Sequence, residues 1–259
     1  MENIRYFTIL GERCSGTHFL QHAILQNFHV EYSKGEKHFF GNREFRDTIH
    51  VPFDEMSLHE KQMRDVDRIP PGQLLTICIV RDPVEWIDSF YKRKHHVPPE
   101  NREPIGRFLS CEFYSIYEEA PKKHMEIMED RNWLTKERYA NLFELRRMKN
   151  EYLHDKVSGD TTNRFFFLRY EDLRDDYENT LEIIQNRFLL RRKYPLMTFV
   201  KTPKYKGTYH SLYEKKPVLL SAEMQTYIWD NVDREQESRM GYFPTCLPSV
   251  VSPENFDFP

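Results

Sequence analysis

The chain has 259 residues, of which 39% are hydrophobic and 14% aromatic; this suffices for a sizeable core, and we expect one domain. Lysine and arginine total 38 against 41 aspartate and glutamate, and the net charge of −3 excludes a global electrostatic footprint for nucleic acid or an anionic membrane surface. Four cysteines without C-x-x-C spacing are too sparse for a disulfide framework, so we expect a protein of the reducing cytoplasm.

The first predicted unit is a strand, a glycine loop and a helix. Ile4–Leu10 mixes β-branched and aromatic residues in a short run, which predicts a strand, and Thr17–Phe28 has apolar residues at helical spacing. A strand that begins this early leads us to expect no signal peptide or anchor before the fold. Between the two elements, Gly11 and Gly16 allow a tight turn with inward N–H groups beside a helix N-terminus. The pattern predicts a phosphate-binding loop.

The residues after the second glycine argue against a metal-bound triphosphate. Loops that bind nucleoside triphosphates continue Gly-Lys-[Ser/Thr], with the lysine on the phosphates and the hydroxyl on Mg²⁺. Here the sequence is Gly16-Thr17-His18, which lacks both groups. We therefore expect a phosphate bound without Mg²⁺; the alternative is an ordinary strand, turn and helix with no ligand.

The next units repeat the strand and helix pattern. Val30–Tyr32 is a brief strand candidate, and Leu74–Val80, apolar at nearly every position, predicts a strand buried on both faces. This longest apolar run is far shorter than a membrane span. It ends at Arg81, after which Asp82 can cap a helix over Val84–Lys94 with Pro83 in its first turn.

The remaining chain adds one further unit and less regular segments. These are a short charged helix near Ser57–Asp67, a helical insertion over 97–163, a strand over Arg164–Tyr170 with a helix to about Phe188, a strand or short helix over Pro195–Val200, a capped helix over Ser221–Asn231 and an irregular tail over 242–259. The fold class is therefore α/β, with a P-loop-type parallel sheet flanked by helices. Because open α/β sheets bind ligands at strand carboxyl ends, the loop at 11–17, Arg81 with Ser89, and Tyr170 should converge.

These motifs resemble those of the PAPS-dependent sulfotransferases. Ser15-Gly16-Thr17 is similar to their phosphosulfate-binding loop, and Arg81 with Ser89 resembles the pair that holds the 3′-phosphate of PAPS. Leu168–Leu173 resembles their Tyr-Glu-Asp-Leu segment, and Lys206-Gly207-Thr208 weakly resembles their late Lys-Gly loop. The resemblance implies sulfuryl transfer from PAPS to a hydroxyl or amine of a small molecule or glycan, with release of PAP. The donor-binding residues it implies are Gly11, Arg13, Cys14, Ser15, Gly16, Thr17, His18, Arg81, Ser89, Tyr170, Lys206 and Gly207.

One position departs from the family pattern. Cytosolic members place a catalytic lysine directly before Ser-Gly-Thr, where this chain has Cys14. Sulfuryl transfer needs positive charge at the leaving oxygen, which we assign to Arg13, with Lys37 or a backbone donor as alternatives. His38 occupies a position similar to the family's catalytic histidine and is the predicted base; Glu12 and Glu36 are its rivals.

Other chemistries remain as alternatives at these residues. His18 and His22 have the spacing of two metal ligands, but no third ligand is evident and no metal is expected. Cys14 as a nucleophile would need a run that ends in arginine, which is missing. Arg81 with Ser89 could be an ordinary helix start, Lys37-His38 a solvated strand end, and Tyr170 a core residue. The chain as a whole could be a Mg²⁺-dependent kinase or a non-catalytic nucleotide-binding module.

Overall fold

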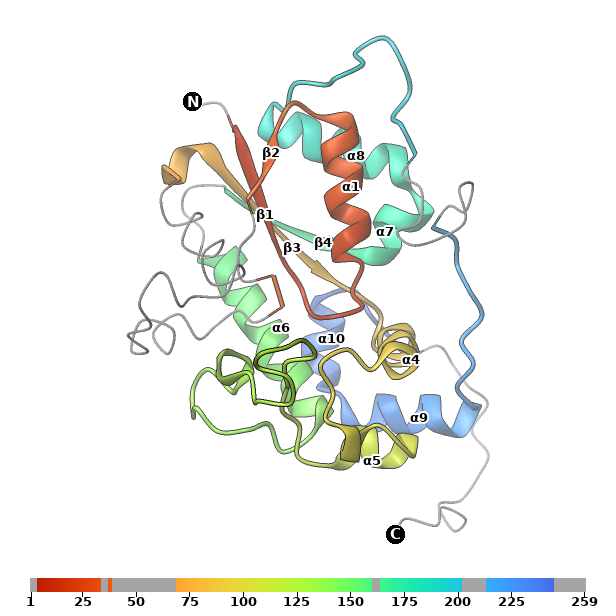
Figure 1. Ribbon diagram of the computed structural model, residues 1–259. Coiled ribbons are helices and arrows are strands. Elements are labelled where there is room, and N and C mark those ends of the chain that lie inside the picture. Colours follow the sequence, from red (N-terminus) through yellow and green to blue (C-terminus); the bar gives the residue numbers. More distant parts are fainter. Residues whose placement is uncertain (1–3, 34–36, 39–68, 160–163, 202–212, 245–259) are drawn as a thin grey trace. The chain divides into compact units, whose positions relative to one another are not determined.

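The computed structural model describes residues 4–33, 37–38, 69–159, 164–201 and 213–244 (Figure 1). The chain divides into two compact units, each built from two separate stretches. The first unit draws on Met1–Arg81 and Tyr152–Lys216, and the second on Asp82–Glu151 and Pro217–Pro259. The single domain expected from chain length stays a prediction.

The first unit contains a four-stranded sheet in the order β2-β1-β3-β4, and every pair is parallel. Its strands are β1 (Tyr6–Leu10), β2 (Glu31–Tyr32), β3 (Leu74–Val80) and β4 (Phe165–Arg169). The register sets Ile9 opposite Ile77 and Ile77 opposite Phe166. Six of the seven residues of β3 are buried, as a central strand with both faces covered requires. The predicted α/β class with a parallel sheet is confirmed.

Helices α1 (Thr17–Asn27), α7 (Tyr170–Asp175) and α8 (Tyr177–Phe188) complete the first unit, with a 3-10 turn η1 (Pro71–Gln73) before β3. Residues of α1, α7 and α8 share one apolar core with the sheet, including Ile24, Leu173 and Leu181. The sequence predicted one helix up to Phe188. Instead the chain breaks between α7 and α8 at Asp176, whose φ of −131° and ψ of 58° are not helical.

The second unit is helical and irregular. Its elements are α4 (Pro83–Arg93), η2 (Pro99–Asn101), α5 (Ile105–Ser110), η3 (Met128–Asp130), α6 (Leu142–Ser158, whose last residues belong to the first unit), α9 (Ala222–Asn231) and α10 (Arg234–Arg239). Helix α4 starts as predicted, because Asp82 accepts hydrogen bonds from the N–H groups of Val84 and Glu85. The insertion is helical only in part, since residues 111–141 hold just isolated bridges and η3.

Several predicted features lie outside the described residues, namely the helix near Ser57–Asp67 and most of the tail over 242–259. The sequence analysis made no prediction between Asn231 and the tail, where the structure has α10. Over the ranges given above, no helix combines the length and apolar character needed to cross a membrane.

Candidate functional site

The loop over Gly11–Gly16 between β1 and α1, which we call the anion loop after its predicted role, contains two left-handed residues. Gly16 has φ 95° and ψ 14°, and Cys14 is also left-handed with φ 64°. The N–H of Ser15 donates to the carbonyl of Glu12 at 3.1 Å, and the Ser15 hydroxyl donates to the same oxygen. Two observations require glycine at position 16: its φ of 95° and the position of its Cβ, which in any other residue would lie 2.3 Å from Cδ2 of Tyr170.

Helix α1 begins directly behind this loop, and its N-terminus carries no protein anion. Its N-cap is Gly16, so no side chain caps the first turn, and that turn contains no acidic residue. The partial positive charge of a helix N-terminus is therefore not compensated by a local carboxylate. An anion seated in the loop would meet this end of α1.

Arg81 reaches the loop from the carboxyl end of β3. Its Nη1 donates to the carbonyl of Cys14 at 3.1 Å, and its Cζ lies 4.4 Å from the ring centroid of Tyr170. The structure thus brings together the loop, Arg81 and Tyr170, as the sequence predicted. Tyr170 is buried, with Gly16 against its ring and the Cζ of Arg174 at 5.3 Å from its centroid. Tyr170 therefore packs against the loop at Gly16 and against Arg81.

Arg174 was missed by the sequence analysis. It lies four residues after Tyr170 on α7, so the helix period sets both on one face. Its guanidinium also binds Asp175 through Nε and Nη2, each at 2.7 Å, and this pair lowers the pKa of Asp175. The i, i+4 spacing from Tyr170 was the available signal.

His38 packs on the first glycine of the loop. Its Nδ1 lies 2.7 Å from the carbonyl oxygen of Gly11, while the N–H of Gly11 donates to the carbonyl of Lys37 at 2.9 Å. A carbonyl only accepts, so Nδ1 carries the proton and Nε2 the lone pair. Burial and the neighbouring charge of Lys37 hold the pKa of His38 well below its usual range. The imidazole is neutral at physiological pH.

Arg13 and Glu12 bind one another. Nε of Arg13 lies 2.6 Å from Oε1 of Glu12, and only 2% of the Arg13 side chain is exposed. The predicted leaving-group cation is thus paired with one of the predicted rival bases. A guanidinium held by a carboxylate offers less net charge to a ligand than the sequence alone suggests.

For the remaining predicted residues, no contact with this loop is described. Ser89 is half-buried on α4 in the second unit, while Lys206, Gly207 and Glu36 lie outside the described residues. His18 is exposed and His22 half-buried on α1. In the described ranges, no group of three or more His, Cys, Asp or Glu side chains is arranged to hold a metal.

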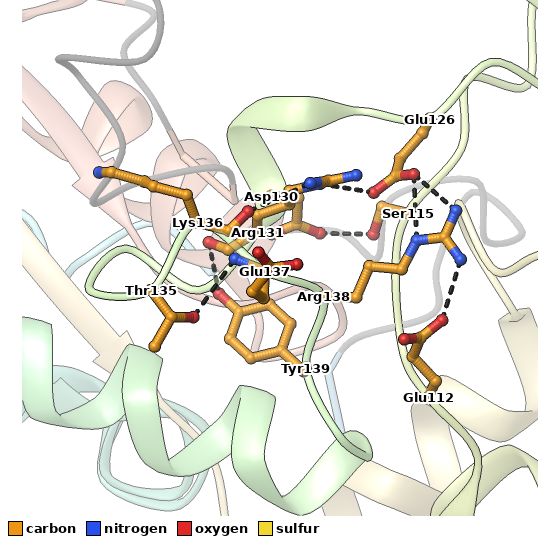
Figure 2. Close-up of polar contacts among 10 residues, drawn as sticks. All are labelled: Glu112, Ser115, Glu126, Asp130, Arg131, Thr135, Lys136, Glu137, Arg138 and Tyr139. Carbon is orange, nitrogen blue, oxygen red and sulfur yellow. Dashed lines mark hydrogen bonds and ion pairs between the residues drawn. The ribbon is translucent and has the colours of Figure 1, made fainter.

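A separate polar network fills the irregular part of the second unit (Figure 2). Arg138 binds Glu126 at 2.8 Å and Glu112 at 2.9 Å, and Arg131 binds Glu126 at 2.8 Å. Beneath them, the buried carboxylate of Asp130 accepts from Ser115 and pairs with Lys149 of α6. These groups satisfy each other, and the network fixes residues that lack regular secondary structure.

Three comparisons with known proteins complete the description. No protein-family model matches the chain. No curated protein matches it either. Among solved structures, the chain is similar to mouse sulfotransferase SULT7A1 complexed with PAP, at 14% identity and a TM-score of 0.33. The match covers 71% of this chain and 58% of that one.

Proposed function

We propose that the chain transfers a sulfuryl group from PAPS to a hydroxyl or amine acceptor and releases PAP, without a divalent metal. The observation that carries this proposal is the neutral imidazole of His38 seated on Gly11, the first residue of the anion loop. The loop itself lacks the lysine and the hydroxyl that handle a metal-bound triphosphate.

The residues divide the work as follows. The α1 N-terminus would hold the phosphate next to the sulfuryl group, together with loop N–H groups other than those of Gly11, Arg13 and Ser15, which donate to Lys37 and Glu12. Nε2 of His38 takes the acceptor proton while the acceptor oxygen or nitrogen bonds to sulfur and the bond from sulfur to the bridging phosphate oxygen breaks. Arg81, whose Nη1 donates to the carbonyl of Cys14 in the loop, would bind the 3′-phosphate of the donor.

The leaving oxygen needs a cation, and Lys37 is the stronger candidate. Arg13 is buried and paired with Glu12, whereas Lys37 is half-buried and adjoins His38. The charge of Lys37 is also close enough to lower the pKa of His38. Lys37 would then have two roles. Its charge adds to the effect of burial in keeping His38 neutral, and it stabilises the negative charge that develops on the phosphate.

The test is PAP release from PAPS in the presence of EDTA, with 2-naphthol, a simple alkylamine and glucosamine oligosaccharides as probe acceptors. We expect turnover with at least one of them. His38→Ala should lower kcat by about 10²- to 10⁴-fold with nearly unchanged PAP affinity, because the base does not hold the donor. The matched control is His29→Ala, an exposed histidine of the same unit.

Two outcomes would contradict the proposal. Activity that vanishes on chelation and returns with Mg²⁺ would favour a kinase. Retained PAP binding without turnover of any probe acceptor would favour a non-catalytic nucleotide-binding module.

A further inference from the structure

A basic segment with an apolar tip follows α8. Residues 187–201 contain five basic residues and no acidic one, in a chain whose net charge is −3. The basic residues are Arg187, Arg191, Arg192, Lys193 and Lys201. The net charge of the whole chain predicts no contact with an anionic membrane. That value is a sum over all residues, however, and this segment is locally basic.

Four apolar side chains between Leu189 and Met197 are exposed, whereas Phe188, Leu190 and Phe199 of the same segment are buried. Leu196 is 99% exposed, Leu189 69%, Met197 63% and Tyr194 49%. Single exposed apolar residues are common, but four within nine positions form an apolar patch, and such patches indicate an interaction site. We name Tyr194–Met197 the tip.

The tip is held in place by the end of α1. The N–H of Lys193 donates to the carbonyl of Asn27 at 2.9 Å, and the Asn27 side chain bonds both the N–H and the carbonyl of Val200, at 2.7 and 3.0 Å. Beside these anchors, Cζ of Arg192 lies 4.1 Å from the ring centroid of Phe199, which is buried. The predicted strand or short helix over Pro195–Val200 is wrong, because these side-chain and backbone bonds to Asn27 replace a regular ladder.

We propose that this segment docks the protein on an anionic lipid bilayer surface. The composition matches the layers of that surface, since Leu196 and Met197 suit the acyl boundary, Tyr194 suits the headgroup level, and the basic residues suit anionic headgroups. A nucleic acid would favour aromatic faces for stacking, but the most exposed residues of the tip are aliphatic. The proposal does not depend on sulfuryl transfer.

The position of the tip agrees with docking. Asn27 lies at the C-terminal end of α1, whereas the anion loop lies at its N-terminal end. In Figure 1 the cyan segment after α8 loops beyond that C-terminal end. The tip can therefore meet a surface without covering the candidate site of the first unit.

The test is co-sedimentation of the full chain with vesicles of phosphatidylcholine alone or with added phosphatidylserine. We expect binding only to the anionic vesicles, weakening as salt is raised. Arg191→Ala combined with Lys193→Ala should weaken binding roughly 20- to 30-fold, at about fivefold per basic residue near the surface. Leu196→Ser should weaken vesicle binding about tenfold. Because Leu196 is fully exposed, the variant protein should have the melting temperature of the wild type.

Matched controls come from the second unit. Lys123→Ala and Met125→Ser remove an exposed cation and an exposed methionine from another surface and should bind like the wild type. Equal sedimentation of the wild type and the Leu196→Ser variant would overturn the proposal. So would a lack of binding to anionic vesicles together with a dimer, seen by analytical ultracentrifugation, that Leu196→Ser abolishes.

Discussion

At the scale of single residues, the tautomer of His38 decides what the site can do. The Gly11 carbonyl fixes the proton on Nδ1, so the lone pair lies on Nε2, away from the loop backbone. A histidine with a lowered pKa stays unprotonated in more acidic solution than an ordinary one. The same contact with Gly11 therefore sets both the orientation of the proposed base and the nitrogen atom that would accept the proton.

This arrangement predicts the acid limb of the pH profile. In wild type, kcat/KM should stay level as the pH falls through about 6.5, the ordinary histidine value, and decline only below it. Lys37→Met removes a positive charge next to His38, so the pKa of His38 should rise and the limb should move to higher pH. If Lys37 also stabilises the leaving oxygen, the plateau should fall about 10²- to 10³-fold.

The control is Lys201→Met, which removes an exposed lysine from the same unit and should change neither the limb nor the plateau. The measurement is kcat/KM for the acceptor as a function of pH, at a saturating concentration of PAPS. A wild-type limb at or above 6.5, or a limb that Lys37→Met leaves in place, would show that His38 is not the group that titrates.

Residue identity predicted part of this site and missed part. The tight turn at Gly16 could be predicted, because glycine adopts a φ of 95° readily. The place of Arg81 could also be predicted, because open α/β sheets bind ligands at the carboxyl ends of their strands. The pairing of Arg13 with Glu12 could not, since neighbouring charges in a loop face each other only when the backbone turns there. The role of Arg13 as the cation at the leaving oxygen stays a prediction.

At the scale of elements, strong local signals predicted best. Leu74–Val80 is apolar at nearly every position and forms β3 as predicted, and Asp82 caps α4 as predicted. The segment over 97–163 was predicted as a helical insertion, but its residues 111–141 are fixed by pairs distant in sequence, such as Arg138 with Glu112. Periodicity carries no information about such pairs.

Helices α6 and α10 of the second unit are joined by a buried ion pair. Arg146 meets Glu237 through two bonds of 2.5 and 2.7 Å, and both side chains are buried. Arg146→Met should lower the free energy of unfolding by about 3–5 kcal/mol, because it leaves the Glu237 carboxylate buried without its partner. Urea denaturation followed by circular dichroism measures this.

The matched control for that pair is Arg239→Met, which breaks an exposed pair with Glu235 and should cost less than about 1 kcal/mol. The double variant Arg146→Met with Glu237→Leu should recover much of the loss, since no charge then stays buried. A single Arg146→Met variant as stable as the wild type would mean that Glu237 finds another partner or is neutral.

At the scale of the whole molecule, ligand binding should be visible as stability. PAP at about a hundred times its Kd should add about 2.7 kcal/mol, which is a rise of several degrees in Tm for a chain of this size. ADP at the same concentration should do much less, because it lacks the 3′-phosphate. Arg81→Ala should weaken PAP binding roughly ten- to hundredfold and reduce the preference over ADP.

The preference, rather than the affinity alone, is the informative quantity here. Arg81 also holds the loop at Cys14, so its loss could weaken every nucleotide alike. Titration calorimetry of both nucleotides separates the two effects, with Arg5→Ala at the amino end of β1 as the control. Equal affinities in wild type, or an unchanged preference in Arg81→Ala, would remove the 3′-phosphate assignment.

Helix α1 links the two ends of the first unit, and its length limits which acceptors fit both proposals. The helix has 11 residues, so at 1.5 Å per residue it separates the anion loop from the docking tip by about 16 Å. A hydroxyl at the headgroup level of the same leaflet would stay below the reach of His38. A soluble acceptor, or a glycan chain that extends well above its lipid, would reach His38 without this limit. The membrane would then localise the protein and would not supply its acceptor.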